Sequence, residues 1–138
     1  MQVVITEWAL QSYLNLKGKA VFNDRQYKTI LRPDAELLNI YPNDLKFSNN
    51  KFWGPAKFNG SMIKHGHKMK WRNFGNGNIQ LRLCVAIVET ELEEVKAERA
   101  FLCTSYIKND QSEKREMVKL KIKIRKILDG TYTYRGTL

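Results

Sequence analysis

The sequence predicts an α+β fold in which N-terminal helices pack on a small antiparallel sheet and a C-terminal helix follows. Three observations support this prediction. Apolar residues recur at helical spacing in the first third of the chain, alternate with a period of two in the middle, and return to helical spacing near the end. The 138 residues suit a single domain, 1–138, and 43% hydrophobic with 28% charged residues is typical of a globular protein. We expect the helices to cover one sheet face and the other face to be open.

The N-terminal third is predicted to contain one strand and two helical segments. VVIT at 3–6 is typical of a strand, and Thr6 can cap a helix over 7–16 that ends at the Lys-Gly-Lys of 17–19. A second helical region begins at Asn23 or Asp24 and ends at 41–44. Pro33 interrupts its period, which predicts a kink or a fresh start there. Residues 43–60 are rich in Asn, Gly and Pro, so we expect a loop.

The rest of the chain is predicted to form an antiparallel meander of about three strands and a final helix. The expected order is a strand over 67–73, a turn over 75–78, a strand over 79–88, a Glu-rich hairpin connection, a strand over 100–108 and a helix over 112–128. Residues 129–138 are expected to be a tail. Cys84 and Cys103 lie in apolar runs, which predicts reduced core residues in a cytoplasmic protein. We expect no membrane partner, because no apolar run is long enough to span one and no secretory pattern opens the chain.

The charge is the most informative feature of the composition. There are 24 Lys and Arg against 14 Asp and Glu, a net charge of +10. Residues 45–88 contain eight basic residues and no acidic one. Because acids are missing nearby in sequence, we expect these bases to face solvent or a ligand. The charge therefore predicts a polyanionic partner, such as nucleic acid, the ribosome, an anionic membrane or an acidic protein. A basic surface that serves only solubility is the alternative.

Lys68, Lys70 and Arg72 form a row on one face of a predicted strand. Neighbours in such a row lie about 6.6–6.8 Å apart, and Arg82 on the next strand can point to the same face. Like charges in a row repel each other unless a polyanion binds there. The row therefore predicts a face that binds a phosphodiester backbone; an ordinary solvated sheet face is the alternative.

The residue types of this row also suit one reaction. RNA carries its own nucleophile, the 2′-hydroxyl, so cleavage needs only positioning, proton transfer and cations around the phosphate. Lysines whose pKa is lowered by neighbouring cations can transfer protons. The sequence is therefore compatible with a ribonuclease that uses no metal.

Other candidates flank the row. His65 and His67 lack a third ligand, so we expect no metal and no other cofactor; they could be acid–base groups beside Lys68 or exposed loop residues. Lys64 adds a cation beside them. Tyr134 and Arg135 in the tail are candidates for contact with RNA or a partner.

The layout of the chain resembles the RelE/ParE superfamily of toxin–antitoxin toxins. The resemblance spans about residues 3–128 and rests on the order of the elements and on KFWGPA, HKMKWR, a glycine turn, RLCVAIV, AFLCTSYIKND and a basic helix. It implies a cytoplasmic toxin that cleaves mRNA, including ribosome-bound mRNA, without metal. It also implies a cognate acidic antitoxin protein that covers the basic face.

The resemblance implies roles for particular residues. Lys68 and Lys70 would hold the RNA phosphate and one of them would transfer a proton, while Arg82 would stabilise the transition state, with Gln80 as the competing register. Lys108 would belong to a further basic cluster, although Asn109 and Asp110 stand where the family has bases. The ParE branch poisons DNA gyrase and lacks this catalytic set. A non-catalytic basic module that binds gyrase or RNA is therefore the alternative function.

Overall fold

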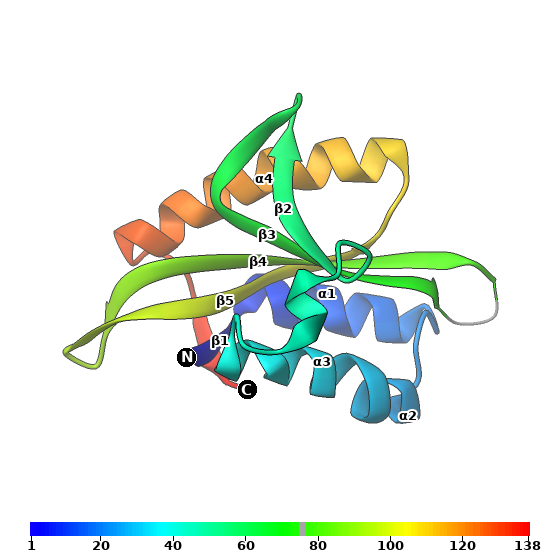
Figure 1. Ribbon diagram of the computed structural model, residues 1–138, viewed down its shortest axis with the longest axis horizontal. Helices are drawn as coiled ribbons and strands as arrows, with labels where there is room; N and C mark the ends of the chain where they lie inside the picture. The colour runs from blue at the N-terminus through cyan, green and yellow to red at the C-terminus, as the bar shows by residue number, and fades with distance from the viewer. Residues whose placement is uncertain (75–76) are drawn as a thin grey trace.

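The structure, a computed structural model, describes residues 1–74 and 77–138 (Figure 1). Within these residues six strands form one sheet in the order β2-β3-β4-β5-β1-β6. The predicted turn over 75–78 lies partly outside the described residues. The strands are β1 (Gln2–Thr6), β2 (Trp53–Phe58), β3 (Ser61–Phe74), β4 (Ile79–Leu92), β5 (Val95–Ile107) and β6 (Tyr134–Thr137).

The sheet is mixed and larger than the sequence predicts. Strands β2 to β5 form an antiparallel meander, but β1 pairs in parallel with β5. Two strands occupy segments for which none was expected. Strand β2 lies inside the predicted loop over 43–60, where Trp53, Gly54 and Ala56 are buried. Strand β6 lies in the segment expected to be a tail and pairs antiparallel with β1.

Helical segments cover both faces of the sheet (Figure 1). One face carries α1 (Glu7–Gly18) and the segment that runs through α2 (Asp24–Gln26), the π-turn η1 (Tyr27–Leu31), α3 (Arg32–Glu36) and the 3-10 turn η2 (Leu37–Ile40). The other face carries α4 (Asp110–Asp129). A short 3-10 turn, η3 (Leu45–Ser48), precedes β2. None of the described helices is both long and apolar enough to cross a membrane.

The prediction of an open sheet face is therefore wrong, and strand β4 shows why. Its residues alternate between two hydrophobic clusters: Leu81, Leu83 and Val85 pack beneath α1 and α3, while Cys84 and Ala86 pack beneath α4. Small side chains allow a helix to approach the sheet closely. Both cysteines are buried and free, as expected.

Several local predictions are confirmed. The Thr6 side chain accepts a hydrogen bond from the Ala9 amide at the start of α1, and Asn23 and Gln26 form a capping box at the start of α2. Pro33 lies in the first turn of α3, which starts afresh at Arg32 directly after η1; the first turn tolerates proline because an N–H there has no partner within the helix. Strand β4 and strand β5 extend into the Glu-rich segment, which turns at Glu93 and Glu94 with positive φ.

Candidate nucleic-acid interface

The predicted basic row lies on the α4 face of the sheet, beside the first turn of α4. The register of the three central strands places Lys70 opposite Arg82, and Arg82 opposite Tyr106. Lys68 lies on the same face, opposite the buried Cys84. Side chains 45 residues apart in sequence therefore gather at one end of α4. We refer to Lys68, Lys70, Arg72, Arg82, Tyr106, Lys108 and Glu113 as the basic cluster.

Lys68 is held by an acidic residue that the sequence did not predict to lie there. Its Nζ donates to Glu113 Oε1 at 2.5 Å, and the Tyr106 hydroxyl donates to Glu113 Oε2 at 2.5 Å. The side chains of Lys68 and Glu113 are only 15% and 19% exposed. The expectation that bases in 45–88 must face solvent or a ligand is thus wrong for Lys68, because its partner comes from α4.

The ionisation of this group follows from its contacts. Burial acts to raise the pKa of Glu113, but the hydrogen bonds from Lys68 and Tyr106 outweigh it and hold that pKa below its ordinary value. Burial, together with the nearby Cys84 and Glu113, raises the pKa of Tyr106 far above the usual range for a phenol. Glu113 is therefore a carboxylate and Tyr106 a neutral donor at neutral pH.

Lys70 lies in a different environment. Its Nζ donates to the backbone carbonyl of Asn50 at 2.9 Å, so the ammonium has a neutral partner rather than a carboxylate. Gly54 leaves the room for this contact, because a Cβ there would lie 3.2 Å from Nζ. Partial burial lowers the pKa of Lys70, and the charges of Lys68, Arg82 and Arg72 lower it further. Lys70 is the cation of the cluster that loses its proton more readily than an ordinary lysine.

Arg82 is 3% exposed and has no carboxylate within ion-pair distance among the described residues. Its Nη2 donates to Gln80 Oε1 at 2.9 Å and its Nη1 to the Leu81 carbonyl at 3.3 Å. Burial, and then the charge of Arg72, lower its pKa. Gln80, the competing register for Arg82, is therefore its neighbour and its hydrogen-bond partner.

The other predicted residues divide into those near the cluster and those apart from it. Arg72 is exposed on the same strand, and the charge of Lys108 helps to lower the pKa of Glu113. Lys64 and His65 lie instead in a hollow against the C-terminal half of α4, with Lys121 and Arg125.

His67, Tyr134 and Arg135 do not join the cluster. His67 stacks on Trp53 (ring centroids 5.0 Å apart), on the opposite face from Lys68, and burial lowers its pKa. Tyr134 and Arg135 lie on β6, four strands from β3 and thus roughly 19 Å away by ordinary strand spacing. Arg135 there forms an ion pair with Glu7.

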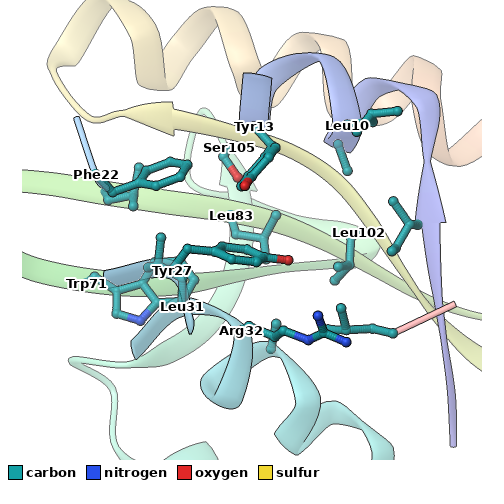
Figure 2. Close-up of a pocket in the computed structure, with 15 residues that line it drawn as sticks. Leu10, Tyr13, Phe22, Tyr27, Leu31, Arg32, Trp71, Leu83, Leu102 and Ser105 are labelled. Atoms are coloured by element: carbon teal, nitrogen blue, oxygen red, sulfur yellow. The ribbon is translucent and has the colours of Figure 1, made fainter. Parts of the chain in front are cut away.

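A separate apolar cavity of about 210 Å³ lies on the other sheet face, between α1 and the η1–α3 segment. Figure 2 shows Tyr13 and Phe22 on one side of it, Tyr27 and Leu31 on another, and Trp71 nearby. No residue of the basic cluster lines this cavity. The described residues also contain no group of three or more His, Cys, Asp or Glu side chains that could hold a metal ion.

Two signals could have located Glu113. It follows a strong cap, Asn109, and stands one turn into a helix that begins directly after β5. Tyr106 faces the same side of the sheet as Lys68, so the first turn of α4 had to pass near that row.

Comparisons with protein-family models, curated proteins and solved structures found no match to this chain.

Proposed function

We propose that this chain is an endoribonuclease that cleaves mRNA by attack of the RNA 2′-hydroxyl on the adjacent phosphate, without a metal ion. The observation that carries the proposal is the pairing of Lys70 with Arg82 across β3 and β4, with Lys68 and Arg72 on the same face. Lys70 and the exposed Arg72, with the buried charge of Arg82 directly beside Lys70, suit a phosphate whose negative charge increases in the transition state.

The environments of the cations suggest distinct roles. Lys70, with its lowered pKa and neutral partner, is the best candidate to accept the 2′-hydroxyl proton. Arg82, which is 3% exposed and whose partners Gln80 and a backbone carbonyl carry no charge, would act through its positive charge from beneath the surface. Glu113 fixes the position of Lys68 beside them. The reaction would leave a 2′,3′-cyclic phosphate and a 5′-hydroxyl.

The resemblance to RelE-type toxins makes the proposal more specific. In that case an acidic antitoxin protein would cover the basic cluster and block it. The proposed setting is cytoplasmic, and ribosome-bound mRNA is the substrate that the resemblance implies.

One observation favours the alternative of a non-catalytic basic module. Lys68, half of the implied catalytic pair, is committed to Glu113 in a largely buried ion pair. A chain that only binds RNA or a protein such as gyrase can tolerate a neutralised Lys68. Catalysis instead requires that the ion pair with Glu113 hold Lys68 in position without removing it from the phosphate.

Induced expression in a bacterial host, with primer-extension mapping of mRNA ends, distinguishes the two functions. We expect growth arrest and new 5′ ends with the natural chain and neither with Lys70→Ala, while both proteins fold equally well by circular dichroism. Arrest without new RNA ends, or arrest that persists in Lys68→Ala/Lys70→Ala, would support the binding module and rule out the nuclease. Lys57→Ala, an exposed lysine outside the cluster, is the matched control.

A further inference from the structure

A basic groove lies at the free edge of β3, next to the basic cluster. Among the described residues, the pairing of β2 with β3 ends where Trp53 faces Met69, and one more backbone bond joins the Lys70 amide to the Phe52 carbonyl at 2.7 Å. Strand β3 continues to Phe74 beyond that point. Beside this stretch, which pairs with β4 but not with β2, is an open hollow of about 620 Å³ between β3, the η3 turn and the helical segment that carries Asp34.

The walls of this groove are strongly cationic. Lys46 and Lys51 lie on one wall, and Lys70 and Arg72 reach it from β3. The one acidic residue among its lining residues is Asp34, and both of its oxygens are engaged. Oδ1 accepts from Lys46 Nζ at 2.7 Å and Oδ2 accepts from Trp71 Nε1 at 2.9 Å. Lys51 and Arg72 form no ion pair within the described residues, so the groove keeps an excess of positive charge.

Lys70 connects the groove to the cluster. Its ammonium extends over Gly54 to the carbonyl of Asn50, which places one cation between Arg82 on the sheet face and Lys51 at the edge. A polyanion that contacts Lys70 and Arg72 can therefore continue over the edge of β3 to Lys51 and remain next to positive charge. A single-stranded RNA of several nucleotides needs such a continuous line of positive charge, whereas a small anion does not.

From this geometry we infer that the groove is the binding path for the single-stranded RNA that flanks the phosphate held by the basic cluster. The inference rests on the proposed function for its ligand and adds a second binding site to it. The groove is open rather than enclosed, which fits a flexible backbone. Amide side chains of Gln26, Asn49 and Asn73 also line it, and amides pair with exposed base edges. The groove is assigned to RNA because it adjoins the cluster proposed to hold the RNA phosphate; an acidic peptide is the other polyanion that the same lysines would attract, and the test below separates the two.

The test compares two charge reversals. Lys51→Glu changes the groove, and Lys57→Glu makes the same change at an exposed position of β2 outside it. Lys46 is left unchanged because its removal would strand the Asp34 carboxylate. The probes are uniform 2′-O-methyl oligonucleotides of about four and about eight residues, which bind but lack the nucleophile, and their affinity is measured by fluorescence anisotropy at several salt concentrations.

We expect Lys51→Glu to weaken binding of the longer probe by about tenfold, with a smaller reduction for the shorter probe. The slope of log affinity against log salt should become shallower by about 0.7 for each phosphate that is no longer neutralised. With a cleavable RNA of the longer length, KM should rise while kcat stays close to that of the natural chain. Lys57→Glu should change none of these quantities by more than about twofold.

Three results would overturn the inference. Equal reductions in Lys51→Glu and Lys57→Glu would show a general charge effect. No change in Lys51→Glu would show that the RNA follows another path. Weaker poly-glutamate binding with unchanged RNA binding would assign the groove to an acidic peptide. Cleavage is measured separately from binding. If RNA binds through Lys51 but is not cut, the groove is an RNA-binding site and the nuclease proposal is refuted. If cleavage depends on Lys70 but is unaffected by Lys51→Glu, the nuclease proposal stands and the groove is refuted.

Discussion

The pair between Lys68 and Glu113 allows a sharp prediction about stability. Glu113→Gln keeps the shape of the side chain but removes its charge, and leaves the largely buried Lys68 ammonium without an ionic partner. The Tyr106 hydrogen bond can persist, because the glutamine amide oxygen still accepts. Removing one member of a partly buried, charged hydrogen bond costs about 1–3 kcal/mol. We therefore expect the free energy of unfolding to fall by about 2 kcal/mol at pH 7.

The pH dependence tests the origin of that destabilisation. The folded-state pKa of Glu113 lies below its ordinary value of 4.5, so the carboxylate stabilises the fold above that value. The contribution disappears as the pH falls through the lowered folded-state pKa. Because the glutamine cannot titrate, the difference between Glu113→Gln and the natural chain should be largest at pH 7 and should shrink towards pH 3.

Urea unfolding at pH 7 and at pH 3, followed by circular dichroism, measures this difference. Glu89→Gln is the matched control, because Glu89 forms an ion pair with Lys96 in which the two side chains are 61% and 73% exposed, respectively. This substitution should lower the free energy of unfolding by less than about 0.5 kcal/mol. A destabilisation of equal size at both pH values would refute an ionic origin. Stability equal to that of the natural chain at pH 7 would refute the pair itself.

Three further predictions concern the cluster and the groove. If Lys70 is the proton acceptor, the cleavage rate should rise with pH, and the midpoint of the rise should lie below 10.5. Arg72→Gln should move that midpoint upward, because it removes a cation that lowers the pKa of Lys70; the pH–rate profiles of both proteins test this. Gly54→Ala should reduce cleavage severalfold with a stability cost of less than about 1 kcal/mol, since the added Cβ would crowd Lys70 Nζ at 3.2 Å; single-turnover kinetics and urea unfolding measure both. Asp34→Asn should lower stability by about 1–3 kcal/mol, because it removes the partner of Lys46 and weakens the bond from Trp71; tryptophan fluorescence during urea unfolding measures the decrease.

Local signals in the sequence predicted much of the fold. The start of α1 at Thr6, the capped start of α2, the alternation in β3 and β4 and the amphipathic α4 all follow from side chains a few residues apart. Strand β6 was not predictable in this way. It has four residues with little burial, and it becomes a strand because its backbone pairs with β1, at the opposite end of the chain. Strand β2 was missed because its Gly and Pro indicate a loop, while pairing with β3 makes it a strand.

The candidate site divides in the same way. The sequence by itself determined that Lys68, Lys70 and Arg72 share a face, because side chains alternate along any strand. It also determined the excess of positive charge and the small residues that lie beneath α4. The same alternation places His67 on the opposite face from Lys68. Only the tertiary structure decided that Glu113 neutralises Lys68, and that Lys46 and Lys51 meet Lys70 across the edge of β3. These are contacts between elements distant in the chain, and their geometry depends on strand order and on which face each helix covers.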